Sequence, residues 1–191
     1  GLVYYQGKYH LFYQHNPFGF SWGNMHWGHA VSENLFSWQE HDDALHPDKT
    51  GTMFSGSGVV DWQNSSGLGT AENPPLCFFY TAAGSNAPEK VPFTQCLAYS
   101  VDNGQEWIKH ASNPVVEWIA GANRDPKVVW HPASRQWIMV LYVEGDRYCL
   151  LKSTDAKSWT RFQDLHLEGV SECPDFFPLP DESGTERWIF W

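Results

Sequence analysis

The sequence predicts an all-β fold, on the basis of its strand-like runs and its lack of helical periodicity. Short runs rich in aromatic and β-branched residues recur along the chain, bounded by Gly, Pro, Asn and Asp. No window keeps a 3.6-residue apolar period over three turns, so very little helix is expected. The chain opens in such a run and closes in another, so both ends are expected to be cut within a longer domain. The runs in order are Leu2–Tyr5, Tyr9–Tyr13, Leu76–Tyr80, Lys127–Trp130, Trp137–Tyr142 and Arg187–Trp191.

A turn motif recurs three times and indicates repeated sheets. Each copy has a serine, then Asn or Asp, then a tryptophan: Ser32–Trp38, Ser100–Trp107 and Ser153–Trp159. The Asn or Asp can bond the backbone of the turn while the tryptophan packs beneath it. The spacing of the copies suits a four-stranded sheet plus loops. The repeat therefore predicts the blades of a β-propeller, of which about three and a half are present. The alternative is a β-sandwich in which these turns recur by coincidence.

Composition and charge narrow the class of function. The 191 residues suffice for one sizeable core and do not require a second domain. Twelve Lys and Arg against 22 Asp and Glu give a net charge of −10, with no basic run, which argues against a nucleic-acid partner. No apolar stretch is long enough to span a membrane.

The four cysteines show no CxxC pair, which makes a zinc or thioredoxin-like site unexpected. Cys77 and Cys96 lie in neighbouring predicted strands and could pair. The favoured interpretation is that they are small buried apolar residues.

Two acidic signatures each open a strand-like run, namely Arg124-Asp125-Pro126 and Glu172-Cys173-Pro174-Asp175. The first strand of each propeller blade lines the central channel, so Asp125 and Glu172 are expected to converge there. Glycosidic bond cleavage usually needs two carboxyl groups held across one sugar. A proton donor that works near neutral pH needs a raised pKa, which burial or a nearby carboxylate supplies. The pattern thus favours a glycosidase, and either burial or a nearby carboxylate could act on its proton donor.

Six motifs, in order along the chain, carry a resemblance to a known family: Phe12–Pro17, Trp22–Asn24, His26–Ala30, Phe54–Ser57, Arg124–Pro126 and Glu172–Pro174. The sequence resembles the catalytic propeller of glycoside hydrolase family 32, which contains invertases, levanases and exo-inulinases. This resemblance implies a five-bladed propeller followed by a β-sandwich. Residues 1–191 would be part of the single propeller domain, with the sandwich outside them.

The resemblance also assigns roles to the two acidic signatures. It makes Glu172 the general acid/base and Asp125 the transition-state stabiliser, with Arg124 orienting Asp125 and bonding a fructosyl hydroxyl. The family's nucleophile is an Asp in a motif whose last residue corresponds to Gly1. The nucleophile is therefore expected to lie before Gly1, and residues 1–191 alone are expected to be inactive.

Four further residues match positions that bind the terminal fructosyl unit, namely Gln14, Trp22, Phe54 and Ser55. The amide and the hydroxyl would hold sugar hydroxyls, and the two aromatic rings would stack on C–H surfaces. Gln14 is the stronger assignment of the first pair, because a polar residue inside an apolar strand needs a partner. For Trp22 and Phe54, packing in the core is the rival interpretation.

The implied activity is retaining hydrolysis of terminal β-D-fructofuranosides in levan, inulin or sucrose. The stretch His46–Met53 looks more like that of levanases and exo-inulinases than that of invertases. The alternatives are fructosyl transfer, an inverting five-bladed glycosidase acting on arabinan or xylan, and a non-catalytic sugar-binding propeller. The expected partner is a fructose-containing saccharide, and the expected location is secreted or periplasmic.

No cofactor or metal is assigned from the sequence. His26 and His29 form an HxxH pattern, but residues three apart on a strand point to opposite faces. The two histidines are therefore not expected to share a metal ion.

Overall fold

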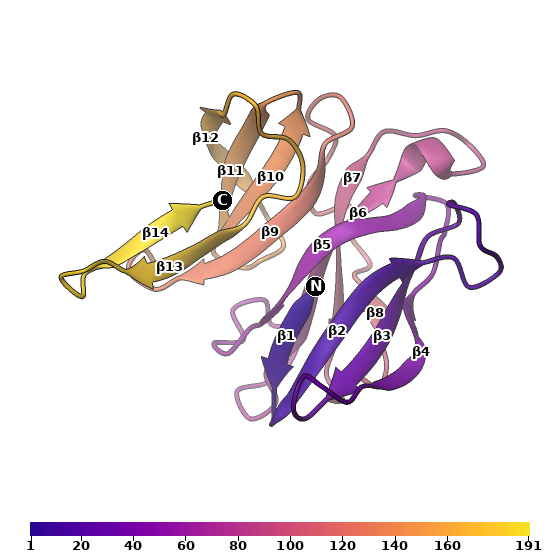
Figure 1. Cartoon of the computed structure of the whole chain (residues 1–191), viewed down its shortest axis with the longest axis horizontal. Helices are drawn as coiled ribbons and strands as arrows, with labels where there is room; N and C mark the ends of the chain where they lie inside the picture. Colours follow the sequence, from indigo (N-terminus) through magenta and orange to yellow (C-terminus); the bar gives the residue numbers. More distant parts are fainter.

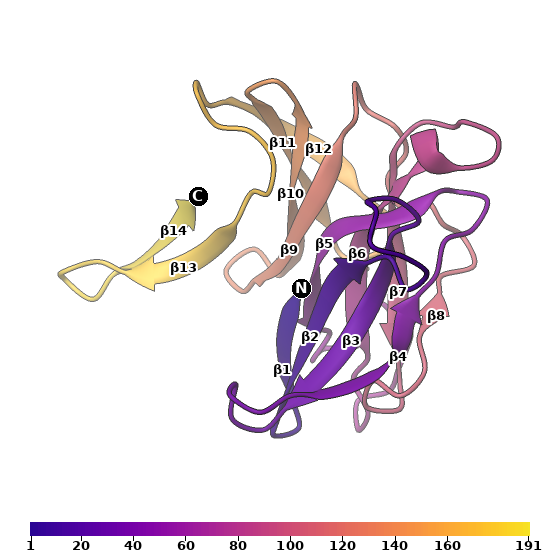
Figure 2. The same cartoon turned by 45° about the vertical axis from the view of Figure 1, so that its right-hand side comes forward.

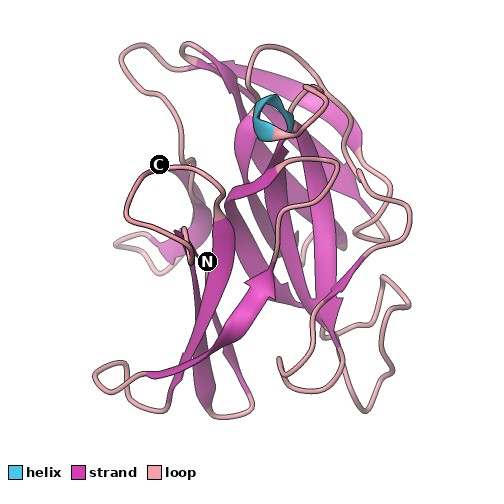
Figure 3. Cartoon of the chain, turned by 90° about the vertical axis from the view of Figure 1, so that its right-hand side faces the viewer, coloured by secondary structure: helices cyan, strands magenta, loops and turns pink.

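The computed structural model describes all 191 residues, as fourteen strands and a single 3₁₀ turn, η1 (Gly84–Asn86). Figure 3 shows how completely strands dominate the molecule, so the all-β prediction is confirmed. No helix in it has the length and apolar character needed to cross a membrane.

The strands form three four-stranded sheets and one hairpin, each built from consecutive strands. Within every four-stranded sheet the strands follow in chain order and pair antiparallel. The first sheet contains β1 (Leu2–Tyr5), β2 (Lys8–His15), β3 (His26–Ser32) and β4 (Gln39–Leu45). The second contains β5 (Thr52–Val60), β6 (Leu76–Ala83), β7 (Thr94–Ser100) and β8 (Ile108–Lys109). The third contains β9 (Arg124–His131), β10 (Gln136–Glu144), β11 (Arg147–Ser153) and β12 (Thr160–His166), and the hairpin contains β13 (Phe176–Pro180) and β14 (Glu186–Phe190).

The first strands of successive sheets lie next to one another. β1 contacts β5, β5 contacts β9, and β9 contacts β13. Figures 1 and 2 show the sheets fanning out from these inner strands, with β4, β8 and β12 at the outer edges. Ser57 links two of the inner strands, because its hydroxyl donates to the Pro126 carbonyl and accepts from the Val128 N–H, both at 2.9 Å. This is the blade arrangement that the turn repeat predicts.

The repeated turn connects the third and fourth strands of each sheet. In the third sheet, the Asp155 carboxylate accepts the N–H groups of Lys157 and Ser158, and the Ser153 hydroxyl bonds the same carboxylate. Asn34 and Asp102 do the same in the first and second sheets. The predicted role of the Asn or Asp in these turns is therefore confirmed.

The core lies between the sheets, and β6 is buried on both faces. Phe78 and Tyr80 point into the cluster shared with the first sheet, whereas Cys77 and Phe79 point into the cluster shared with the third. Cys96 belongs to the first of these clusters and Cys77 to the second, so the two thiols face apart. The cysteines are free, as the favoured interpretation predicted for Cys77 and Cys96.

Candidate active site

A cleft of about 550 Å³ opens where the inner strands β5 and β9 meet β2, the β2–β3 loop and the β12–β13 loop. Its lining brings together every residue that the sequence assigned to catalysis or sugar binding. Gln14 comes from β2, Trp22 from the β2–β3 loop, and Phe54 and Ser55 from β5. Arg124 and Asp125 begin β9, and Glu172 precedes β13. The structure therefore places the two acidic signatures at one cleft, as the sequence predicted.

Arg124 connects the two acidic signatures. Its Nη2 lies 2.5 Å from Oε1 of Glu172, and its Nε lies 3.8 Å from Oδ2 of Asp125. Nη1 donates to the carbonyl of Ala122 at 2.7 Å, and the guanidinium lies over the ring of Tyr142. Burial works against the charge on Arg124, but the hydrogen bond and the charge of Glu172 outweigh it and raise the pKa of the guanidinium. The side chain is therefore a fixed cation between two carboxylates.

Asp125 is a buried carboxylate held in a rare backbone conformation. Its side chain is 7% exposed, and its φ of 62° lies in the left-handed region that non-glycine residues seldom adopt. The Asp125 N–H donates to the Thr81 hydroxyl at 3.0 Å, and Oδ2 accepts the Cys173 N–H at 3.1 Å. Burial raises the pKa of Asp125, and the Cys173 N–H and the Arg124 charge offset this only in part. Strain of this kind, held in place by the surroundings, clusters at functional sites.

Glu172 lies at the mouth of the cleft. Its backbone is also left-handed, with φ of 63°, and so is that of Cys173, with φ of 39°. The Tyr148 hydroxyl donates to the Glu172 carbonyl at 3.3 Å. The side chain is 54% exposed, so of the two influences considered from the sequence, burial does not act on Glu172 in this structure. The β12–β13 loop carries Glu172 at the surface, with the Arg124 guanidinium as its one charged contact.

The four predicted sugar-binding residues form two pairs on the opposite side of the cleft. Gln14 Nε2 donates to the Ser55 hydroxyl at 2.8 Å, which supplies the partner that an amide in an apolar strand needs. The rings of Trp22 and Phe54 meet edge to face at 5.9 Å. Trp22 is 70% exposed, so core packing does not explain it. Phe54 is half-buried between Trp22 and Phe93.

Five further residues line the cleft without a role predicted from the sequence. They are Ser85, Asn86, Phe93, Ala122 and Cys173. Cys173 sits inside the Glu-Cys-Pro motif, which was the one available signal for it. The others lie in the η1 segment and in loops before β7 and β9, where the sequence shows no pattern that would have identified them.

The arrangement combines a solvent-accessible carboxyl group with a buried, oriented carboxylate. Glu172 can exchange a proton with a bound molecule or with water at the mouth of the cleft. Asp125 offers a buried carboxylate, at a position where electrostatic interactions are stronger than in bulk solvent. The amide, hydroxyl and aromatic rings opposite can hold a polyhydroxylated ring between polar and apolar contacts.

The chain matches one known family and several of its members. The model of the glycosyl hydrolases family 32 N-terminal domain matches residues 1–191. The levanase of Bacillus subtilis is 43% identical over 99% of the chain, which corresponds to 28% of that protein. The extracellular exo-inulinase of Aspergillus awamori is 37% identical over 99% of the chain and 40% of that protein. A structure of the β-fructofuranosidase of Schwanniomyces occidentalis complexed with fructosyl-erythritol superposes with a TM-score of 0.89 at 33% identity, covering all of this chain and 38% of that one.

The chain thus spans between about a quarter and two fifths of the length of these relatives. The match to the family model nevertheless runs through every sheet, and the cleft assembles the residues of all the motifs that carry a site assignment. The chain belongs to glycosyl hydrolase family 32.

Proposed function

We propose that the protein carrying this chain is a retaining β-fructofuranosidase, which releases terminal fructose from a fructan or from sucrose. The observation that carries the proposal is the Arg124 guanidinium, which holds Glu172 and Asp125 at one cleft. The relatives named levanase, exo-inulinase and β-fructofuranosidase support the substrate class. In this proposal, residues 1–191 form part of one catalytic propeller of five blades.

In this proposal, Glu172 donates its proton to the oxygen that leaves the fructosyl carbon. A carboxylate nucleophile attacks that carbon as the C–O bond breaks, and a covalent fructosyl–enzyme intermediate forms. Ionised Glu172 then removes a proton from water, whose oxygen attacks the same carbon and releases the nucleophile and fructose. Asp125 holds sugar hydroxyls and stabilises the developing positive charge.

The nucleophile is assigned by the family resemblance to a residue before Gly1. The contacts of Asp125 support a role other than that of the nucleophile. Asp125 is already held by the Cys173 N–H and sits beside Arg124, which suits a carboxylate that binds rather than attacks. Gln14 and Ser55 would bind the hydroxyls of the terminal fructosyl unit, with Trp22 and Phe54 against its apolar face.

We further propose that the protein is secreted, because a relative is named an extracellular exo-inulinase. The net charge of −10 supports a neutral saccharide as the partner rather than a nucleic acid. The open and polar character of the cleft mouth around Glu172 is compatible with a chain-end substrate that extends into solvent.

The test is an assay of fructose release by the full-length protein that contains residues 1–191, on sucrose, inulin and levan. Glu172→Gln keeps the size of the side chain but removes the titrating proton, and should lower kcat by about 10²–10⁴-fold. Glu182→Gln, in the exposed turn between β13 and β14, is the matched control. Undiminished release by Glu172→Gln would overturn the acid/base assignment, and activity on arabinan alone would overturn the substrate class.

A further inference from the structure

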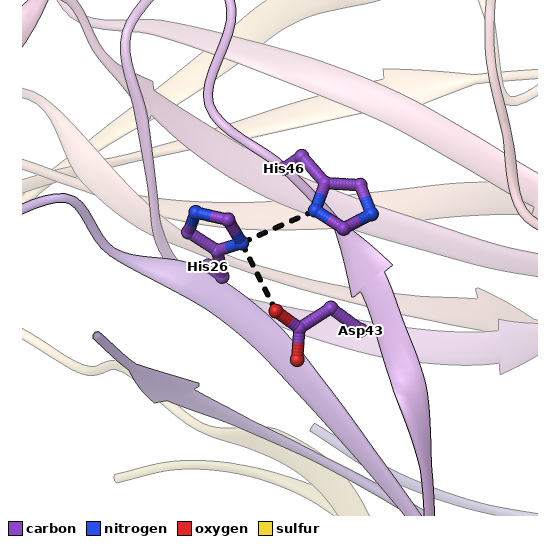
Figure 4. A group of neighbouring side chains, drawn as sticks. All are labelled: His26, Asp43 and His46. Atoms are coloured by element: carbon purple, nitrogen blue, oxygen red, sulfur yellow. Dashed lines mark hydrogen bonds and ion pairs between the residues drawn. The ribbon is translucent and has the colours of Figure 1, made fainter. Parts of the chain in front are cut away.

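Three side chains converge at the end of the first sheet, outside the cleft lining. His26 is the first residue of β3, Asp43 lies in β4, and His46 follows β4. Figure 4 shows the His26 ring pointing at both of the others: its Nδ1 lies 3.0 Å from Oδ2 of Asp43 and 3.2 Å from Nδ1 of His46. Trp27 pairs with Leu45, which brings His26 and His46 opposite one another just beyond the paired residues.

Protons alone do not satisfy this arrangement. The Nδ1 of His26 carries at most one proton, and that proton can point fully at only one of its two neighbours. When this proton points at Asp43, no proton of His26 lies between its Nδ1 and the Nδ1 of His46. Without that proton, the lone pair of His26 faces the carboxylate of Asp43. One of the two short contacts therefore always lacks a full hydrogen bond, whereas a bound cation would satisfy all three atoms together.

The two contacts from His26 come close to the ligand spacing of a tetrahedral metal site. Bonds of about 2.0–2.2 Å to nitrogen and oxygen place neighbouring ligand atoms roughly 3.2–3.6 Å apart. The contacts from His26 are 3.0 and 3.2 Å, and the three ligand atoms all lie within 4.8 Å of one another. Two imidazoles and one carboxylate select Zn²⁺ and its transition-metal neighbours rather than Ca²⁺ or Mg²⁺, which prefer oxygen ligands.

Two outer residues orient the ligands. His15 Nε2 lies 2.6 Å from Oδ1 of Asp43, which occupies that oxygen and leaves Oδ2 toward the ion. The amide of Asn24 lies 3.4 Å from Nε2 of His26, the nitrogen that carries the proton once Nδ1 binds a metal. Turned end for end, this amide presents its oxygen as the acceptor for that proton. Partners of this kind are usual behind metal-bound histidines and carboxylates.

We propose that His26, Asp43 and His46 bind one divalent transition-metal ion, Zn²⁺ for preference, with a fourth position open to water. His46 is exposed, so the ion has a path from solvent, and His26 is buried, so one ligand is held rigidly. This site is separate from the proposed chemistry at Glu172. The sequence assigned no metal because it considered His26 with His29, whereas the second and third ligands come from β4 and the turn after it.

The position of the site suggests what the ion does. Residues 16–25 form the loop that carries Trp22 to the cleft, and this loop leaves β2 at His15 and enters β3 at His26. Phe18 of the same loop packs against the His26 ring. An ion held at this point would brace both ends of the loop and so fix the base from which Trp22 projects.

The test measures metal binding directly. The protein is stripped with a chelator, and Zn²⁺ is titrated by calorimetry while Co²⁺ is followed by its visible absorption. The expected result is one equivalent of Zn²⁺ with micromolar or tighter affinity, and Co²⁺ bands of tetrahedral intensity. His46→Gln and Asp43→Asn should abolish both signals, and His15→Gln should weaken Zn²⁺ binding by about 10–100-fold.

The matched control is His166→Gln, which removes a surface histidine that contacts one carboxylate, Asp146, at 3.0 Å. It should leave the affinity for Zn²⁺ unchanged. Because His46 is exposed, His46→Gln should retain the fold, which circular dichroism checks. Absence of stoichiometric binding to the stripped protein overturns the proposal, as does equal binding by the wild type and by the double variant Asp43→Asn/His46→Gln.

Discussion

Arg124 Nη2 lies 2.5 Å from Oε1 of Glu172, and this ion pair joins the start of β9 to the loop before β13. The same guanidinium lies beside Asp125 and over Tyr142. The Arg124 guanidinium therefore holds both acidic signatures in place.

Arg124→Lys should lower kcat/KM for fructan by about a hundredfold, because one ammonium cannot replace a planar fork that reaches Glu172 and the Ala122 carbonyl together. Steady-state kinetics on inulin measure the effect. Arg187→Lys, in an exposed pair with Asp181, is the control and should change kcat/KM little. Equal kinetics for the wild type and Arg124→Lys would show that the fork is not needed.

Asp125→Asn should reduce activity by at least about a hundredfold, since it removes the fixed charge. It should also leave the protein at least as stable at neutral pH. Because burial raises the pKa of Asp125 in the folded state, ionising it opposes folding. That penalty is fully present above the folded pKa and disappears as pH falls towards the unfolded value of about 3.9. Urea unfolding at neutral and acidic pH should show the advantage of the Asn variant shrinking on acidification. An advantage that grows on acidification would contradict the prediction.

Trp22→Ala should weaken the use of substrate without weakening the fold. The ring is 70% exposed, so its removal should change the free energy of unfolding by no more than about 0.5 kcal/mol. Loss of an aromatic face should lower kcat/KM by roughly tenfold at most. Phe36→Ala is the control, because this ring is 92% exposed and lies in the turn of the first sheet. A large drop in melting temperature for Trp22→Ala would instead indicate a packing role.

Ser57→Ala should destabilise the protein by about 1–3 kcal/mol, because it leaves the Pro126 carbonyl and the Val128 N–H unpaired between β5 and β9. Urea unfolding followed by tryptophan fluorescence measures this. Ser183→Ala removes an exposed hydroxyl from the β13–β14 turn and should cost much less. Equal effects of the two changes would mean that the hydrogen bonds of Ser57 between the inner strands do not stabilise the protein more than an exposed hydroxyl does.

Asp155→Ala should cost about 1 kcal/mol of stability, whereas Asp155→Asn should cost less, because Asn34 fills the same role in the first sheet. Burial opposes ionisation of Asp155, but the N–H groups of Ser158 and Lys157 outweigh it and lower its pKa. The contribution of the charge is therefore present above the unfolded pKa of about 3.9 and is lost as pH falls through the folded value. Thermal unfolding across that range should show the wild type converging on Asp155→Asn.

Much of the fold was predictable because its signals are local. The runs Tyr9–Tyr13, Leu76–Tyr80 and Trp137–Tyr142 all fall within strands, namely β2, β6 and β10. Many of their side chains are buried. Buried positions favour apolar residues, so these strands show a recognisable apolar pattern in the sequence. The outer strands β4 and β12 were not singled out, because they are mostly exposed and their sequences are polar. Their place follows from the turn repeat that precedes each.

The cleft was predictable in its members, but its internal contacts were not. The motifs singled out Gln14, Ser55 and Trp22, which line one cleft, and Arg124 was expected to orient Asp125. The exposure of Glu172 and its ion pair with Arg124 were not foreseen, because both depend on how the β12–β13 loop folds across β9.

The sequence by itself determined the all-β class, the repeated Ser–Asx–Trp turns and the family, since each rests on residues close together in the chain. Only the tertiary structure decided which distant side chains share an environment. It joined His26 to Asp43 and His46, which come from β3, β4 and the turn after β4. It also put Arg124 between two carboxylates from different sheets. Such contacts depend on how the sheets pack against one another, which no local sequence pattern shows.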